Sequence, residues 1–247
     1  MLPYFQQPVL ALGRWHITAF AVCAVAALII ARWIILRRAR RFNIGYQEIA
    51  PLYLSVIVAA LAGAVAEPLF TARGGLASHG AILGGLAGGM ACCWVQRIPW
   101  PRAVMMLDIA AFAAPFAGAI GRLGCALAHD HRGLPAEGWF AVHFPEGGRY
   151  DLGFIDLLFL SALCVVFVAV DRKPRPSLFF MGLAAVAYGA FRLWRERLDV
   201  TSDYLAWTVV LAIGVAALWL GRVGWRSTEQ RFETHPRSPA KLAGFRS

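Results

Sequence analysis

Residues 152–170 read LGFIDLLFLSALCVVFVAV, an apolar stretch with one charged side chain, Asp156. About 20 apolar residues carry an α-helix across the hydrocarbon core of a bilayer. Further apolar runs of similar length occupy residues 17–36, 51–70, 76–95, 103–121, 177–194 and 204–221. A helix is the form in which a single lipid-exposed segment satisfies its own backbone. The sequence therefore predicts an all-α, polytopic integral membrane protein with about seven transmembrane helices, of which 76–95 is alternatively a partly re-entrant segment.

The composition agrees with a membrane protein and excludes several other classes. Of the 247 residues, 59% are hydrophobic and 15% are charged, and the mean hydropathy is +0.59. A soluble domain usually has about a quarter of its residues charged, so a disordered chain, a disulfide scaffold and an ordinary cytosolic enzyme are excluded. The net charge of +10 suits nucleic acid, but basic residues also collect on the cytoplasmic side of membrane proteins. We therefore expect the charge to reflect topology, with no nucleic-acid partner.

The basic residues are distributed unevenly among the connections between the apolar runs. Fifteen of the 24 Lys and Arg residues lie on alternate connections and in the C-terminal tail, within residues 37–41, 97–102, 172–175 and 222–246. Under the positive-inside rule, this bias predicts a periplasmic N-terminus and a cytoplasmic C-terminus. Residues 1–221 are expected to form a single transmembrane domain. Residues 222–247 are basic and contain two prolines, which predicts a disordered cytoplasmic tail near anionic lipid.

Ionisable side chains are costly within a membrane, so each one is a candidate for function. Six such residues lie near the predicted outer ends of five different runs: Glu67, His79, Arg122, Asp156, Arg192 and Glu196. Their common depth predicts a polar pocket that opens toward the periplasm. Asp108 is the exception, because it lies near the inner end of its run, and we expect it to be a structural partner.

Two arginines at the predicted outer level are candidates for phosphate recognition. Arg192 and Glu196 are four residues apart and share a helical face, so they either form a salt bridge that only holds the helix end or present a guanidinium to phosphate. Arg122 lies between Gly121 and Gly124, and such glycines allow a ligand or a helix to approach the backbone closely. His79, which also has glycine neighbours, is equally compatible with packing and with catalysis.

A metal site is not expected from the sequence. His129, Asp130, His131 and His143 are close in the chain, but the first and third of these residues point in opposite directions on a strand and diverge on a helix. No second ligand pair is spaced to close such a site. We therefore predict neither a metal nor another cofactor.

Several motifs occur in a fixed order along the chain. They are Pro-Val-Leu-Ala-Leu-Gly at 8–13, Gly-Gly-x-x-x-His-Gly at 74–80, Asp108 followed by Ala-Pro-Phe at 114–116, Gly-Arg-Leu-Gly at 121–124, Arg-Lys-Pro-Arg-Pro at 172–176, and Tyr-Gly-Ala-Phe-Arg at 188–192 with Glu196. Over about residues 8–220, the chain resembles the prolipoprotein diacylglyceryl transferases, which are bacterial inner-membrane enzymes that start lipoprotein maturation. The topology derived above agrees with that of this family.

The resemblance implies an enzyme that acts on phosphatidylglycerol and on the lipobox cysteine of a prolipoprotein. It joins diacylglycerol to the sulfur as a thioether and releases glycerol 1-phosphate, within the inner membrane and with its site toward the periplasm. By position, His79, Arg122, Arg192 and Glu196 match residues that the family uses at its site. Gly133 matches a glycine of the signature loop. Substrate-binding roles are expected for Arg122, Gly133, Asp130, Asp156 and Glu67.

The chain also departs from the family at several positions. Phe20 stands for a tyrosine and Ala64 for an arginine, Cys125 and Ala128 stand for asparagines, and Asp130 and Asp156 stand for glutamates. These changes leave two alternatives open, namely a divergent homologue with another lipid or acceptor and a non-enzymatic lipid-binding or transport protein. A transporter usually shows internal repeats and broken helices at the membrane midplane, which are not evident here, and a pure lipid-binding module needs no His79.

Overall fold

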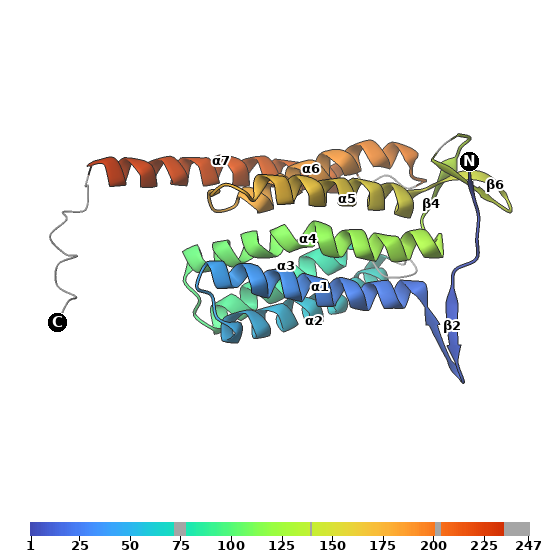
Figure 1. Cartoon of the computed structure of the whole chain (residues 1–247), viewed down its shortest axis with the longest axis horizontal. Coiled ribbons are helices and arrows are strands. Elements are labelled where there is room, and N and C mark those ends of the chain that lie inside the picture. Colours follow the sequence, from blue (N-terminus) through green and yellow to red (C-terminus); the bar gives the residue numbers. More distant parts are fainter. Residues whose placement is uncertain (72–77, 139, 201–203, 235–247) are drawn as a thin grey trace.

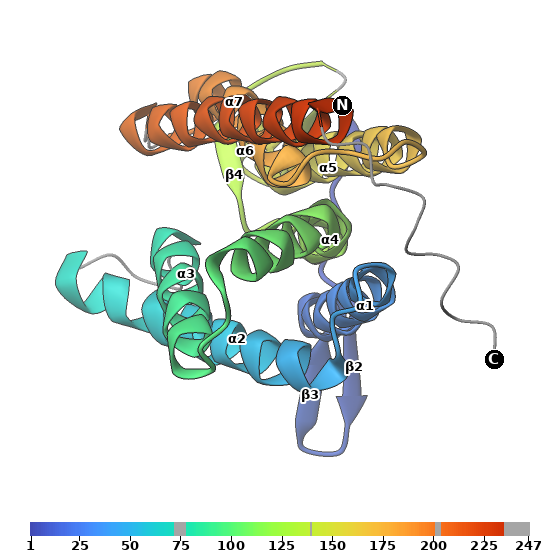
Figure 2. The ribbon, with the colours of Figure 1, turned by 90° about the vertical axis from the view of Figure 1, so that its left-hand side faces the viewer.

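The structure, a computed structural model, describes residues 1–71, 78–138, 140–200 and 204–234. Long helices dominate this part of the chain, and most of them run roughly along its long axis (Figure 1), whereas α2 is strongly inclined to it (Figure 2). They are α1 (Ala19–Arg41), α2 (Tyr46–Thr71), α3 (Ser78–Val95), α4 (Trp100–Ala128), α5 (Leu152–Val170), α6 (Phe179–Arg195) and α7 (Tyr204–Thr234). Each helix corresponds to one of the apolar runs identified in the sequence.

Five of these helices are long and apolar enough to cross a membrane. Their spanning segments are Ala19–Arg41, Tyr46–Ala66, Trp100–Ala128, Leu152–Val170 and Tyr204–Gly224. The apolar part of α3, Gly80–Val95, is shorter, and α6 has 17 residues. The chain is thus a mostly helical, multi-pass membrane protein, as the apolar runs predict. The crossing count of seven and the placement of the termini stay predictions.

Helix α4 lies at the centre of the arrangement (Figure 2). On one side it packs against α1, where Met106 and Ile109 join Ile35 in an apolar cluster. On the other side it packs against α5 and α6, where Phe112 meets Phe167 and belongs to a second cluster. Helix α7 packs on α6, and α3 packs on α2. Because α4 contributes to both apolar clusters, it links the α1 side of the bundle to the α5–α6–α7 side.

Helices α2 and α3 approach each other through glycines. A Cβ atom on Gly84 would overlap the carbonyl oxygen of Ala59 and lie 3.2 Å from the Cα atom of Gly63. Small residues allow such backbone contact in lipid, where van der Waals packing drives helix association. The glycine-rich sequence of α3 therefore serves helix packing at this point.

Replacing Gly84 with alanine is expected to destabilise the α2–α3 pair by about 1–3 kcal/mol, because the two backbones must move apart to admit a methyl group. Gly85 provides a matched control in the same helix, since a Cβ atom there would meet the Ala60 Cβ atom at an ordinary 3.5 Å. Thermal unfolding of both variants in one detergent measures the difference. Equal melting temperatures for Gly84→Ala and Gly85→Ala would contradict the close-contact assignment.

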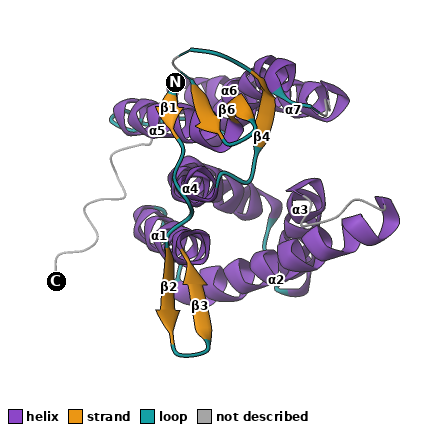
Figure 3. Ribbon diagram, turned by 90° about the vertical axis from the view of Figure 1, so that its right-hand side faces the viewer, coloured by secondary structure: helices purple, strands orange, loops and turns teal. Residues whose placement is uncertain are grey.

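Short strands accompany the helices, although the sequence predicted an all-helical fold. They are β1 (Leu2–Pro3), β2 (Val9–Leu12), β3 (Trp15–Thr18), β4 (Arg132–Pro135), β5 (Ala141–Phe144) and β6 (Gly147–Asp151). Strands β2 and β3 form an antiparallel hairpin, and the others form a sheet in the order β1-β5-β6-β4. Both sheets lie at the end of the molecule where α4 ends and α5 begins (Figure 3). With two to five residues each, these strands are too short for a search of long apolar runs to reveal.

At the opposite end of the bundle, charged side chains that are largely buried connect the helices. Asp108 of α4 accepts a hydrogen bond from the backbone N–H of Met181, at 2.9 Å. It thereby satisfies a donor in the first turn of α6, whose N-cap residue Leu178 makes no side-chain cap. Arg38 of α1 is paired with Asp171 at 2.7 Å and lies over the Phe112 ring at 4.0 Å. Asp108 is thus the structural partner that its depth predicted.

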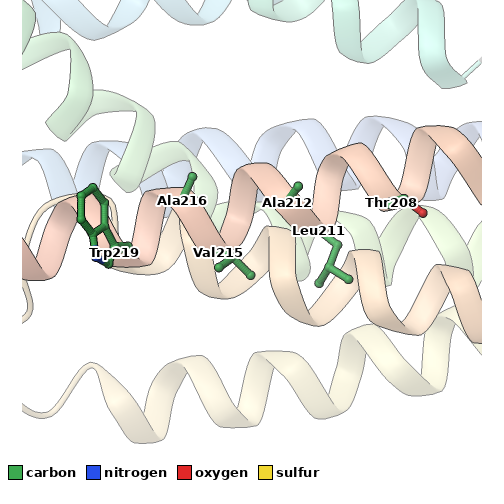
Figure 4. Close-up of a pocket in the computed structure, with 6 residues that line it drawn as sticks. All are labelled: Thr208, Leu211, Ala212, Val215, Ala216 and Trp219. Atoms are coloured by element: carbon green, nitrogen blue, oxygen red, sulfur yellow. The ribbon is translucent and has the colours of Figure 1, made fainter.

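Helix α7 continues to Thr234, beyond residue 221, where the transmembrane domain was expected to end. Residues 222–234 of the predicted tail therefore belong to this helix, and residues 235–247 lie outside the described part of the chain. An apolar recess follows one side of α7 (Figure 4), and it is lined by Thr208, Leu211, Ala212, Val215, Ala216 and Trp219. Its lining contains no charged side chain, so it is separate from the polar site described next.

Candidate functional site

Asp156 is the centre of a buried cluster of charges. It lies in the second turn of α5, whose first turn is capped by the Asp151 side chain at the Phe154 N–H. Its side chain is 0% exposed, and its Oδ2 atom is 3.1 Å from Nε of Arg122, which α4 supplies. An isolated carboxylate at this depth would be very costly, so the cluster depends on its arginines.

Arg192 and Glu196 come from the end of α6, and Glu196 begins a short 3-10 helix (Glu196–Leu198). Nη2 of Arg192 is 2.9 Å from Oε1 of Glu196, and Nη1 is 3.7 Å from Oδ2 of Asp156. The guanidinium carbon lies 4.3 Å from the centre of the Trp207 ring of α7. Such a cation–π contact fixes the plane of the guanidinium as well as its position. Arg192 is therefore held on three sides before any substrate arrives.

Arg195 is a member of the cluster that the sequence analysis missed. Its Nε atom lies 3.5 Å from Oδ1 of Asp156, and its Nη2 atom lies 3.1 Å from Asp199. Only 2% of its side chain is exposed. Two sequence signals pointed to it, since Arg195 is three residues after Arg192, on a neighbouring helical position, and directly precedes Glu196.

The charges of the cluster are formally balanced. Three guanidinium groups, from Arg122, Arg192 and Arg195, face three carboxylates, from Asp156, Glu196 and Asp199. Buried ion pairs are stable only when geometry and hydrogen bonds repay their desolvation. Arg122 and Arg192 retain 19% and 11% side-chain exposure, so they are more open than Arg195. These two arginines are the part of the cluster best placed to meet an anion.

Gly133 lies on β4 in a position that admits no side chain. A Cβ atom there would lie 2.5 Å from the carbonyl oxygen of Leu198 and 3.0 Å from Leu152. The glycine thus allows β4 to pack against the loop that follows α6, beside the charged cluster. Its role in this structure is close packing, and a direct contact with substrate stays a prediction.

Asp130 takes no part in the cluster around Asp156. Its Oδ1 atom lies 2.5 Å from Nδ1 of His131. Hydrogen bonds to Asp130 and to Cys125 raise the pKa of His131 to about 9, against the effect of partial burial. His131 follows Arg122 by nine residues and lies beyond the end of α4. The interaction of Asp130 with substrate stays a prediction.

The sequence analysis also missed a buried His–Asp pair. Nδ1 of His129 is 2.6 Å from Oδ2 of Asp151, and both side chains are buried. The Tyr4 and Phe5 rings pack on the imidazole at centroid distances of 5.2 and 4.6 Å. The pair joins the end of α4 to the start of α5 under the N-terminal segment. It thereby fixes the relative positions of Arg122 and Asp156.

Two of the predicted site residues cannot be placed by their side chains. Glu67 lies in the last turns of α2 and His79 at the second position of α3, but both side chains lie outside the described part of the structure. The backbone places the end of α2 and the start of α3 at the end of the bundle that also carries the charged cluster (Figure 1). Four predicted residues, Arg122, Asp156, Arg192 and Glu196, are brought together.

The chain matches the family model described as prolipoprotein diacylglyceryl transferase over residues 7–225. It belongs to that family. A phosphatidylglycerol–prolipoprotein diacylglyceryl transferase of Haemophilus influenzae (strain PittEE) is 25% identical, over 78% of this chain and 80% of that protein. The protein of the same name from Thermosynechococcus vestitus is 26% identical, over 91% of this chain and 94% of its own length. The protein of this name from Ectopseudomonas mendocina is 26% identical, over 84% of this chain and 87% of its own length.

Family membership defines the general class of the protein. It is a transferase of lipoprotein biosynthesis with membrane-embedded helices. The match extends from residue 7 to residue 225 and so contains all four residues of the cluster that the sequence predicted. The transport and lipid-carrier alternatives are thereby set aside.

Proposed function

We propose that the protein transfers the diacylglyceryl group of phosphatidylglycerol to the lipobox cysteine of a prolipoprotein, with release of glycerol 1-phosphate. The observation that carries the proposal is the pair Arg122 and Arg192, which Asp156 holds at one level from two different helices. The relatives are named for the same donor, phosphatidylglycerol, and for a prolipoprotein acceptor, which supports the proposal.

The arginines suit the chemistry of the departing group. The cysteine sulfur attacks the glycerol CH₂ that bears the phosphodiester oxygen, so a C–S bond forms as the C–O bond breaks. Negative charge then collects on the phosphate of glycerol 1-phosphate. Preorganised guanidinium groups in a site that excludes bulk water stabilise such charge without reorganising. Arg122 and Arg192 meet this requirement because their partners already fix them.

A base is needed on the acceptor side of the reaction. A cysteine thiol has a pKa near 8.5, and the thiolate is the nucleophile. We assign proton removal to His79, whose imidazole has an intrinsic pKa in the neutral range. Its position in the first turn of α3, at the end of the bundle that carries the arginines, supports this assignment. Glu67, in the last turns of α2, is proposed to contribute to the same polar surface.

Purified protein, labelled phosphatidylglycerol and a lipobox peptide test the proposal directly. We expect lipidated peptide and glycerol 1-phosphate in equal amounts. His79→Ala should lower turnover by about 100-fold, the lower end of what general base catalysis contributes, whereas the exposed His143 gives a matched control, His143→Ala, at the wild-type rate. Full activity in His79→Ala removes the base assignment. If phosphatidylglycerol gives no lipidated peptide but another phospholipid does, the protein is a divergent homologue with a different lipid donor.

The proposal places the protein in the bacterial inner membrane, with seven crossings, the N-terminus in the periplasm and the C-terminus in the cytoplasm. The basic connections after α1, α3 and α5 all lie at the end of the bundle opposite the sheets (Figure 1), which supports this orientation. Reporters fused after Arg41, Arg102 and Arg175 should be cytoplasmic, and one inserted near Glu137 should be periplasmic. A cytoplasmic signal at Glu137 would reverse the orientation and place the arginine site on the wrong side.

A further inference from the structure

Three side chains with potential metal-ligand atoms, a sulfur, a nitrogen and an oxygen, meet where α4 ends. The Sγ atom of Cys125, a nitrogen of His131 and an oxygen of Asp130 all lie within 4.8 Å of one another. Within the described ranges of the chain, this is the one group of three His, Cys, Asp or Glu residues close enough to share a metal ion. The sequence analysis considered three histidines here and no cysteine, so it missed this combination.

The backbone explains why these residues meet. Helix α4 ends at Ala128, and His129 adopts a left-handed conformation with φ of 50°, which turns the chain back over the last helical turn. The turn is anchored by the His129–Asp151 pair and by the N–H of Leu152, which donates to the carbonyl oxygen of His131 at 2.9 Å. Cys125 and His131 are therefore presented by two fixed pieces of backbone. A site that is already assembled pays little ordering cost when an ion binds.

We propose that Cys125, His131 and Asp130 form a binding site for a single zinc ion. Thiolate, imidazole and carboxylate are all ligands that Zn²⁺ accepts, and three protein ligands leave a fourth position for water or a substrate oxygen. Oδ1 of Asp130 and Nδ1 of His131 are 2.5 Å apart, so these two donors already face one position, and zinc binding there would release the proton that they share. The proposed transfer reaction needs no metal, so this site goes beyond that function.

Access and charge also favour an ion at this position. The side chains of His131 and Asp130 are 46% and 40% exposed, whereas Cys125 is buried beneath them, so a hydrated ion reaches two donors before it reaches the thiol. A thiolate and a carboxylate together neutralise the charge of Zn²⁺. The nearby cation Arg122 is itself paired with Asp156 at 3.1 Å, which reduces its repulsion of the ion.

Zinc binding to the full chain tests the inference. Tag-free protein in detergent is stripped with a chelator and titrated with Zn²⁺ in competition with a chromophoric chelator. We expect one ion per chain, and a loss of affinity of at least about 100-fold in Cys125→Ser and His131→Ala, since removal of partners one shell further out already costs about 10–100-fold. Cys164→Ser and His143→Ala are matched controls that should bind as the wild type does.

A spectroscopic measurement on the wild-type protein keeps the inference testable if a variant fails to fold. Co²⁺ in place of zinc should give a sulfur-to-metal charge-transfer band, which reports a thiolate ligand, and Mg²⁺, which prefers oxygen ligands, should not compete. Stoichiometric zinc binding with this band supports the site. Absence of binding, a cobalt spectrum without the band, or equal affinity in Cys125→Ser and Cys164→Ser overturns it.

Discussion

Replacing Asp156 with alanine is expected to lower the free energy of unfolding by about 3–5 kcal/mol, which is typical when one partner of a buried ion pair is removed. The change leaves Arg122, Arg192 and Arg195 without the carboxylate that lies between them. Their mutual repulsion should displace the two more open arginines and remove transferase activity as well. Thermal unfolding in detergent, together with the peptide lipidation assay, measures both effects.

Glu146→Ala provides the control for the Asp156 prediction. Glu146 forms a pair of similar length with Arg132, at 2.8 Å, but both side chains are largely exposed. Exposed pairs contribute about 0–1 kcal/mol, so this variant should unfold close to the wild type. If Asp156→Ala unfolds no more easily than Glu146→Ala, the charged cluster does not stabilise the helix bundle.

Substituting lysine for Arg122 or for Arg192 is expected to reduce turnover by about 100- to 1,000-fold, the range seen when one preorganised donor to a developing negative charge is removed. Lysine keeps the positive charge but lacks the planar fork that binds two phosphate oxygens. The Arg192→Lys variant also loses the contact between the guanidinium group and the Trp207 ring. Initial rates with labelled phosphatidylglycerol measure the loss, and the folded fraction is checked by gel filtration.

The matched control for the lysine variants is Arg197→Lys. Arg197 lies in the same stretch of chain as Arg192, but it is exposed. The Arg197→Lys variant should therefore turn over phosphatidylglycerol at the wild-type rate. Glu196→Gln should have a smaller effect than Arg192→Lys, because Asp156 and Trp207 still hold the arginine. Wild-type turnover in both Arg122→Lys and Arg192→Lys would show that these arginines do not bind the phosphate.

The helices and the membership of the charged cluster were largely predictable from the sequence. Runs of apolar residues reveal membrane helices because lipid imposes one requirement on their whole length. Charge within a membrane is costly, so Arg122, Asp156 and Arg192 stood out in the apolar runs. Successive helices cross in opposite directions, and this alone places the end of one run and the start of the next at the same depth.

The remaining features depend on contacts between segments that are distant in sequence. Arg195 is buried because Asp156 of another helix and Asp199 lie within reach. Its spacing from Arg192 indicates a neighbouring helical position but not this burial. Trp207 lies within an apolar run, and its contact with Arg192 of another helix is visible only in the fold. The meeting of Cys125 with His131 depends on a single left-handed residue, His129, which sequence periodicity does not reveal.

The position of Asp156 has a consequence for how the protein enters the membrane. A charged residue opposes the insertion of a helix by the translocon, by about 2.5–3.5 kcal/mol at the helix centre and by less toward its ends. Asp156 lies in the second turn of α5, and α5 is made before α6 supplies Arg192 and Arg195. At that moment, Arg122 in α4 is the partner within reach. The ion pair between α4 and α5 thus assists biogenesis first, by allowing α5 to leave the translocon beside α4. The same carboxylate later receives the arginines of α6, so the charged cluster is completed only in the later steps of insertion.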